Sequence, residues 1–423
     1  MTRKLCLHGV SIAHPETFAA DVAKRLKLTL KQGKLKEKEY GENLTVRYRR
    51  GKLVRDTFLP YKVRTMEGIL LADSHLSDLM DVEFRYKRGS EKAVLAAVRK
   101  LLSGPDSFVV AEPDILLRLN AMQGKPYPPM DGDAGRLRAM RQYLSWQVFA
   151  IGQHWHLLYK DPANKLLVRQ LRVRIRRLRS CFVFFREGLP ETETSRWQDM
   201  FREEADRLST MRELDVAAQM CQRRRDAEGE TNDVPSPLLD HFLQLREDEE
   251  KKVLPGDSLN NHTEKLAEFL LWMDGMEDIV PKGIAGEPAR QFVDRRLGEW
   301  ADGLLALKQK YPDFSNMDDL HKIRIKVKRF RYVTQTIDLA RLPLSLLRQL
   351  KQLQDVLGLL HDDYVNASWA GGIALKHPED ETLQKQVHSF RNWQSARSES
   401  ALAMVSGMWE SFLQMLEENL KKN

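Results

Sequence analysis

Two basic segments of this chain, 152 residues apart, have nearly the same pattern of residues. Residues 169–179 and 321–331 each contain six Lys or Arg and no Asp or Glu. The surrounding sequence aligns without a gap over the pairs Tyr159 and Tyr311, Asn164 and Asn316, Leu171 and Ile323, and Arg179 and Arg331. Guanidinium and ammonium groups at this density suit the binding of a polyanion. The duplication therefore predicts an anion site with two related halves.

Helical spacing gives each segment an apolar face with a basic stripe beside it. The apolar faces are Val168, Leu171, Ile175, Leu178, Phe182 and Phe185, and Leu320, Ile323, Val327 and Phe330. The stripes are Arg169, Arg172, Arg176 and Arg179, and His321, Arg324, Lys328 and Arg331. Each stripe residue directly follows a residue of the apolar face, so at 100° per residue the stripe borders the buried face. We expect neighbouring helices to enclose these basic groups.

A run of Lys and Arg is also typical of a solvated helix face. Solvated faces usually place Glu four residues from Lys for mutual support, whereas both segments lack acids. Repulsion within each stripe costs stability unless an anion or nearby carboxylates offset it. The same register in both copies favours binding over solvation.

Linked phosphates are the anion that these segments suit best. Arginine predominates in the first copy, and its planar fork matches phosphate oxygens in bidentate fashion. From Arg169 to Arg179 the helix axis spans about 15 Å, enough for several phosphates. Nucleic acid is the alternative, but single-strand binding generally adds exposed aromatic residues for stacking. Because Phe182, Phe185 and Phe330 fall on the apolar faces, a phosphate polymer without bases fits better.

The composition is that of an ordinary soluble protein with two or three domains. The 423 residues are 42% hydrophobic and 30% charged, with a formal net charge of +8. No apolar run approaches the roughly 18 residues of a membrane span, and the N-terminus has no secretory signal. Three scattered cysteines suit a reducing compartment. We expect a cytoplasmic protein with no membrane partner.

A linker is predicted at residues 124–135, which are rich in Pro, Gly and Asp. Residues 1–125 are predicted to form a small α+β domain. Its expected elements are strands at Leu5–Val10 and Val82–Arg88, helices at Pro15–Leu28 and Glu91–Leu102, and a hairpin of Thr45–Arg49 and Leu53–Leu59 turning at Gly51.

Heptad-like apolar spacing dominates from residue 136 onward and predicts a mainly α fold. Polar loops are expected at residues 223–237, 255–263 and 281–288. They divide residues 136–420 into two repeats, about 136–235 and 285–420, each with roughly four helices. The predicted architecture is a duplicated helical bundle behind a small α+β domain.

The basic segments and two pieces that follow them resemble the CHAD family, the conserved histidine α-helical domain. The matching pieces are Leu320–Arg324 and Lys328–Tyr332, their upstream copies Val168–Val173 and Arg176–Ser180, and the following pieces Met211–Val216 and Leu353–Asp362. The resemblance covers residues 136–420, about two thirds of the chain. It implies two pseudo-symmetric four-helix bundles whose basic helices line a shared groove.

Inorganic polyphosphate is the ligand that the resemblance implies, and polyphosphate granules are a possible location. Motif positions carry the binding role over to Arg169, Arg172, Arg176, Arg177, Arg179, Arg212, His321, Arg324, Lys328, Arg329, Arg331 and His361. A second interpretation of His361, Asp362 and Asp363 is a polar cluster that orients the basic side chains.

The two repeats depart from each other at two positions. The histidine of the family motif is Arg169 in the first repeat and His321 in the second. Arginine keeps the donors and makes the charge permanent, so histidine-based pH sensitivity should be halved. Asp215 of the first repeat corresponds to Tyr364 in the second, so the halves are not equivalent there.

No enzyme motif accompanies the basic segments. The sequence contains no Walker phosphate loop, no zinc-ligand spacing and no nucleophile motif. CHAD domains often follow a triphosphatase-like CYTH domain, which opens with a Glu-x-Glu-x-Lys strand. The first strand here has no such motif, and Glu83, Arg85 and Lys87 are as well explained by an edge strand. We expect a non-catalytic protein without cofactor or metal; the alternative is a phosphate-chain hydrolase with a divergent CYTH-like domain.

Overall fold

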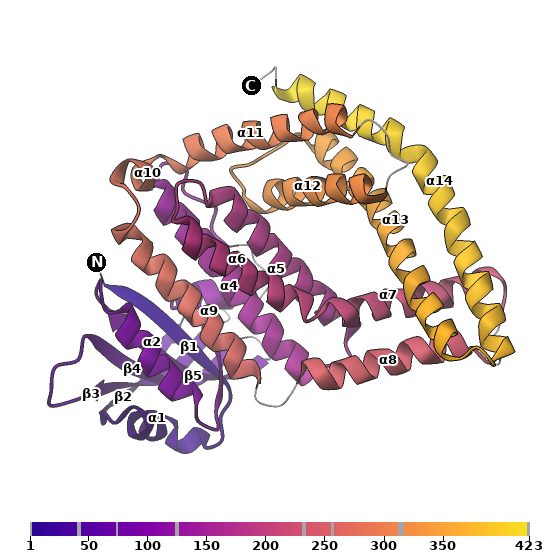
Figure 1. The fold of residues 1–423 in the computed structure, drawn as a ribbon. Coiled ribbons are helices and arrows are strands. Elements are labelled where there is room, and N and C mark those ends of the chain that lie inside the picture. Colours follow the sequence, from indigo (N-terminus) through magenta and orange to yellow (C-terminus); the bar gives the residue numbers. More distant parts are fainter. Residues whose placement is uncertain are drawn as a thin grey trace. The chain divides into compact units, whose positions relative to one another are not determined.

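The structure, a computed structural model, describes residues 2–39, 44–72, 75–122, 127–230, 234–254, 258–311 and 317–420. Contacts group the chain into two compact units. Unit 1 is Met1–Asp161, Gly188–Trp197 and Pro255–Ala289, and unit 2 is Pro162–Glu187, Gln198–Leu254 and Arg290–Asn423. The predicted fold class is confirmed, since a small antiparallel sheet precedes a mainly helical remainder (Figure 1). The symmetry of the two bundles stays a prediction.

Unit 1 contains a six-stranded antiparallel sheet in the order β2-β3-β4-β5-β1-β6. The strands are β1 (Arg3–Ser11), β2 (Thr29–Glu39), β3 (Leu44–Val54), β4 (Tyr61–Ala72), β5 (His75–Tyr86) and β6 (Ser107–Ala111). The helices of this part are α1 (Phe18–Leu26), α2 (Glu91–Leu102) and α3 (Ile115–Met122). The strands predicted near residues 5 and 82 and the helices predicted near residues 15 and 91 are confirmed. The interpretation of the strand around Glu83 as an edge strand is wrong, because β5 lies between β4 and β1.

The hairpin predicted around Gly51 is wrong. Strand β3 runs straight through this glycine, which pairs with Thr65 of β4. A Cβ atom at position 51 would collide with the Thr65 hydroxyl and with a methyl group of Leu30. Glycine here permits a close approach between side chains and backbone, and the same residue type in a strand pattern is equally consistent with a turn.

Helices from the predicted helical region also belong to unit 1. They are α4 (Arg136–Lys160), α9 (Ser258–Gly275) and α10 (Lys282–Gly286). Asn260 of α9 connects this helix to β6, because its side-chain oxygen accepts from the Phe108 amide at 3.1 Å. Its side-chain nitrogen donates to the carbonyls of Leu102 and Asp106, at 2.9 and 2.8 Å. The loop predicted at 255–263 is therefore helical from Ser258 onward. The compact units divide the chain differently from the predicted domain boundaries, which stay predictions.

Of the predicted linker at 124–135, residues 124–126 lie outside the described residues. Residues 127–134 form neither helix nor strand. Asp313 and Asn316 of the second copy also lie outside the described residues.

Unit 2 consists of helices whose apolar faces were readable from the sequence. They are α5 (Lys165–Phe185), α7 (Ser209–Ala227), α8 (Pro237–Val253), α11 (Ala289–Lys310), α12 (Met317–Thr336), α13 (Leu344–Lys376) and α14 (Glu381–Leu420); α6 (Glu191–Asp206) is divided between the units. The ten predicted apolar positions of α5 and α12 are all buried. Asn164 caps α5, since its side chain accepts from the amides of Leu166 and Leu167 at 3.1 and 3.3 Å.

Two described hydrophobic cores share the long helices α13 and α14, which lie side by side in Figure 1. One core combines α11 and α12 with the first half of α13 and the second half of α14. The other combines α7 and α8 with the opposite halves of the same two helices. Helix α13 thus connects the two cores and is held at both ends.

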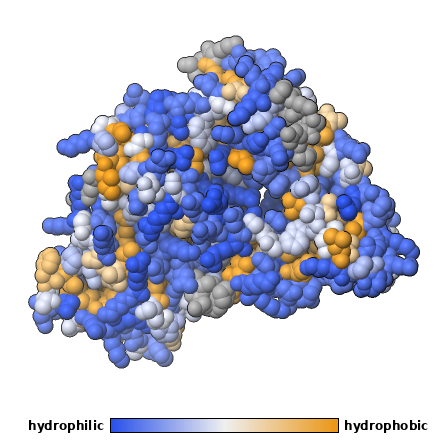
Figure 2. All heavy atoms as spheres, in the orientation of Figure 1, coloured by the Kyte–Doolittle hydropathy of each residue, from blue (hydrophilic) through white to orange (hydrophobic). Residues whose placement is uncertain are grey.

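Hydrophilic residues predominate on the face drawn in Figure 2. Among the described helices, none has a stretch long and apolar enough to span a bilayer.

A buried ion pair fixes α7 to α8. Arg246 donates to Asp215 at 3.1 Å, to Glu250 at 2.8 Å and to the carbonyl of Pro162 at 3.1 Å. Asp215 and Arg246 are 2% and 6% exposed. Burial raises the pKa of Asp215, and the Arg246 charge opposes that rise.

Arg246→Met should destabilise the protein, because it leaves the buried Asp215 carboxylate without its cation. Breaking such a pair costs about 3–5 kcal/mol. The measurement is urea unfolding followed by far-ultraviolet circular dichroism. Arg202→Met is the matched control, since Arg202 is exposed and bonded to exposed Asp199, a pair worth about 0–1 kcal/mol. Equal losses in the two variants would show that the buried pair does not stabilise the fold.

Candidate functional site

Helices α5 and α12 pack against each other, so the two basic segments come together in space. Beside them α5, α7, α12 and α13 enclose a cavity of about 520 Å³, which we call the basic cavity. All of its lining residues belong to unit 2. Eight Lys or Arg and four Asp or Glu line it. The apolar faces of α5 and α12 position these cations. When the apolar faces are buried, the basic stripes beside them turn toward the neighbouring helices.

Seven of the twelve predicted binding residues line the basic cavity. They are Arg169, Arg172, Arg176, Arg212, Arg324, Lys328 and His361. Arg212 and His361 occupy corresponding places in the motifs after each basic helix, and both face this cavity. The two copies thus contribute to one site.

The other five predicted residues do not line the cavity themselves. Arg177, Arg179, Arg329 and Arg331 are half-buried, and burial lowers the pKa of the last three. Arg329 further lowers the pKa of Arg179, and Arg177 that of Arg331, so each pair spans α5 and α12. His321 lies next to His361, with ring centroids 5.5 Å apart.

Arg172 has a structural task inside the site. It is 5% exposed and donates to the carbonyl of Ala205 at 2.7 Å and to the Ser209 hydroxyl at 2.6 Å. Burial, and then the charge of Arg176, lower its pKa to about 9. Arg172 therefore connects α5 to the end of α6 and the start of α7, while adding positive potential to the cavity.

Lys328 is the cation most affected by its surroundings. Burial, and then the charges of Arg176 and Arg324, lower its pKa to about 6, and the Asp362 charge opposes them. Within the described part of the chain Lys328 has neither an ion pair nor a hydrogen bond. A bound anion would raise the pKa of this amine.

The two histidines are neutral at neutral pH. Burial is the first cause of the lowered pKa of His361, about 3, followed by the charge of Arg324. Burial and Arg324 also lower the pKa of His321. Both rings therefore offer a hydrogen bond without a charge, in contrast to Arg169 at the corresponding place in the first copy.

The neighbouring acids Asp362 and Asp363 have different partners. Burial raises the pKa of Asp362, while the charges of Arg324 and Arg212 oppose the rise. Asp363 accepts from the Ser398 hydroxyl at 3.3 Å and lies 3.6 Å from Arg397 of α14. Asp362 therefore faces the basic side chains, whereas Asp363 connects α13 to α14.

Sequence reasoning missed Asn366, a buried donor on the cavity wall. It is 1% exposed, and its Nδ2 atom has no hydrogen-bond partner among the described residues. A buried amide donor of this kind is costly unless it is bonded. Its position four residues after Asp362, on the same face of α13, was the available signal. Buried Tyr332 also lines the cavity.

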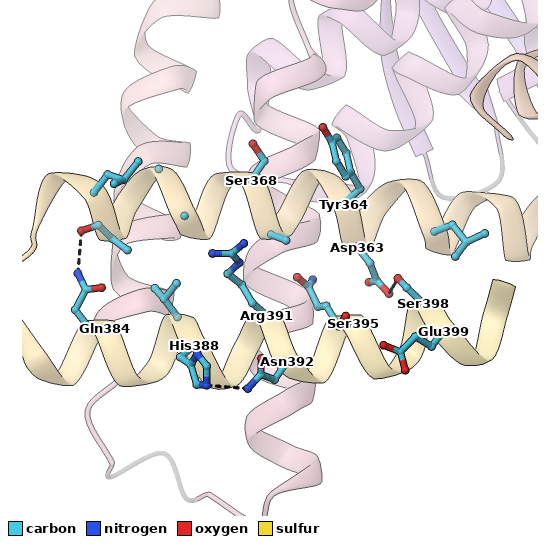
Figure 3. Close-up of a pocket in the computed structure, with 18 of the residues that line it drawn as sticks. Asp363, Tyr364, Ser368, Gln384, His388, Arg391, Asn392, Ser395, Ser398 and Glu399 are labelled. Carbon is cyan, nitrogen blue, oxygen red and sulfur yellow. Dashed lines mark hydrogen bonds between the residues drawn. The ribbon is translucent and has the colours of Figure 1, made fainter. Parts of the chain in front are cut away.

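A larger hollow of about 1240 Å³ lies between α13 and α14 (Figure 3). Arg391 points from α14 toward α13, and small residues such as Gly371 and Ala367 line the opposite wall. Arg391 is its one Lys or Arg among the described lining residues. This hollow therefore lacks the charge density that the two basic segments predict.

Unit 1 contains a polar hollow of about 100 Å³ on the sheet, with Lys4, Arg50, Arg64 and Arg85 around it. Its two acids are already paired. Asp81 accepts from Arg118 and His8, and Glu83 pairs with Arg85 and Lys4. Carboxylates paired in this way are poorly placed to hold a divalent cation.

Comparison with known proteins identifies the helical region. The family model of the CHAD domain matches residues 142–371, more than half of the chain. The crystal structure of the CHAD domain from the plant Ricinus communis has a TM-score of 0.53 at 20% identity, covering 67% of this chain and 94% of that one. PptA from Streptomyces chartreusis has a TM-score of 0.52 at 14% identity, covering 66% and 99%.

At these identities the two structures show a common fold. No curated protein matches the chain. Together with the family match, the paired basic helices lead to one conclusion: the chain belongs to the CHAD-domain family.

Proposed function

We propose that this protein binds inorganic polyphosphate in the basic cavity and does not catalyse a reaction there. The observation that carries the proposal is the crowding of eight Lys and Arg against four acids around one cavity of about 520 Å³. Like charges brought together in a partly desolvated site cost free energy until an anion neutralises them. Burial, and then the charges of Arg176 and Arg324, lower the pKa of Lys328, and the Asn366 amide offers an unbonded donor on the same wall.

Several linked phosphates suit the cavity better than nucleic acid does. Tyr332, the tyrosine on its wall, is 7% exposed and offers no open face to a base. Phe182, Phe185 and Phe330 are buried in the core. Polyphosphate is also the ligand of some members of the CHAD family.

The absence of catalysis is part of the proposal. The cavity has arginines to hold phosphate, but its described lining residues include no serine, threonine or cysteine nucleophile, and their one hydroxyl is that of buried Tyr332. Hydrolysis of phosphate chains generally needs divalent cations. Among the described residues no three metal-ligating side chains come together.

Affinity should rise with phosphate chain length, because longer chains engage more of the eight cations. It should fall steeply with salt as counterions are released. Isothermal titration calorimetry with orthophosphate, tripolyphosphate and long polyphosphate measures both trends. DNA and RNA at matched salt are the competitors. Equal affinity for orthophosphate and long chains would contradict the proposal, as would stronger binding of nucleic acid.

The double variant Arg176→Gln, Arg324→Gln should bind long polyphosphate about a hundredfold or more weakly. Each removes a hydrogen bond to a charged group, worth about 1.5–3 kcal/mol. Arg172 is left intact because it also connects α5 to α7. Arg348→Gln is the control, since Arg348 is exposed on α13 and outside the cavity lining. Unchanged binding in the double variant, with native helicity by circular dichroism, would place the site elsewhere.

Polyphosphate binding should take up a proton at Lys328. In the free protein its pKa is lowered from 10.5 to about 6, so the amine is neutral at pH 8. A bound anion raises that pKa, and affinity therefore increases as the pH falls from 10.5 toward 6 and levels off below 6. Calorimetry at pH 8 in buffers of different ionisation enthalpy should give an uptake of about one proton.

Lys328→Gln should lose this uptake while keeping measurable binding through the arginines. The same uptake in the variant would assign the proton to another group.

A further inference from the structure

A second hollow of about 390 Å³ adjoins the basic cavity within unit 2, and we call it the side cleft. Glu213 of α7 and Val365 of α13 line both. Its volume lies within the range of small-molecule sites, about 300–1,000 Å³. It is therefore placed to hold a group that is joined to an anion in the basic cavity.

The side cleft has the aromatic surface that the basic cavity lacks. Tyr364 is 65% exposed, although it is a large side chain on a well-packed helix. In Figure 3 it points from α13 away from α14, on the same side as Ser368. His241 and His377 lie with their ring centroids 4.5 Å apart, and Trp369 completes the lining. The open phenol ring of Tyr364 is a stacking surface for a planar group.

A hydrogen bond fixes the wall between the two spaces. Trp369 Nε1 donates to Glu213 at 3.2 Å, which holds the indole of α13 against α7. From Asp362 in the basic cavity, α13 rises about 3 Å to Tyr364 and about 10 Å to Trp369 in the side cleft. A ribose and its first phosphates can bridge that length. Exposed Lys376 adds a cation at the far end of the cleft.

We propose that the side cleft receives the base of a nucleoside polyphosphate whose phosphates lie in the basic cavity. The inference rests on the proposed function, since it assigns the phosphates to the same cavity. The residue that carries it is Tyr364, which replaces the buried Asp215 of the first repeat and has no packing role of its own. Stacking tolerates any base, because every base presents a π-face.

The test compares ligands with equal numbers of phosphates. Adenosine triphosphate, guanosine triphosphate and inorganic tripolyphosphate are titrated without divalent cations into the full-length wild type, Tyr364→Ala and Tyr364→Phe. In the wild type the nucleotides should bind about tenfold more tightly than tripolyphosphate, which is about 1.4 kcal/mol. Tyr364→Ala should lose this advantage without changing the affinity for tripolyphosphate. Tyr364→Phe keeps the ring and should keep the advantage.

The possible failures are distinguishable. Equal losses for all three ligands in Tyr364→Ala, or no preference for nucleotides in the wild type, would overturn the inference and leave polyphosphate binding intact. If neither tripolyphosphate nor long polyphosphate binds to the wild type, the proposed function fails and the inference fails with it. Because Tyr364 is exposed, neither substitution should impair folding.

Discussion

The structure of unit 2 depends on how positive charge is held at the contact between α5 and α12. Ten apolar side chains of these helices are buried, and each contributes about 1.5–3 kcal/mol by leaving water. This burial holds together two stripes of cations that would otherwise repel each other. Burial, and after it the repulsion from Arg176, lowers the pKa of both Lys328 and Arg172. The fold therefore maintains a site whose charge is only partly balanced by its own acids.

The faces of α5 and α12 were predictable because a 3.6-residue period records which side of a helix is apolar. The partners of each basic residue were not, because they come from distant parts of the chain. Arg172 donates to Ala205 at the end of α6 and to Ser209 at the start of α7, and no local pattern indicates these contacts. Arg179 belongs to the same stripe, yet it lies beyond the cavity and next to Arg329. Periodicity predicts the side of the helix on which a basic residue lies, whereas its enclosure in a cavity depends on the neighbouring helices.

Gly51 was wrongly predicted and Asn366 was missed for the same reason, since their surroundings come from distant parts of the chain. Gly51 was predicted as a turn, since a glycine between apolar alternations suits both a turn and a close approach. The close approach is the one observed, because Thr65 of β4 packs against Gly51. Asn366 was missed because one neutral amide on a long helix carries no charge pattern. Asn366 becomes a candidate site residue only because it is 1% exposed and lies on the wall of a basic cavity.

The difference between the repeats at Asp215 and Tyr364 has a physical explanation in the packing around each. Asp215 is buried and accepts a hydrogen bond from Arg246, so an aromatic ring in its place would remove the buried carboxylate from that arginine and leave it Glu250 as its ion-pair partner. Tyr364 is not part of such a buried ion pair, because its side chain is 65% exposed. A position freed from a structural bond can change its chemistry at little cost to stability. The asymmetry thus falls where the second copy is free to vary, beside the cavity that both copies form.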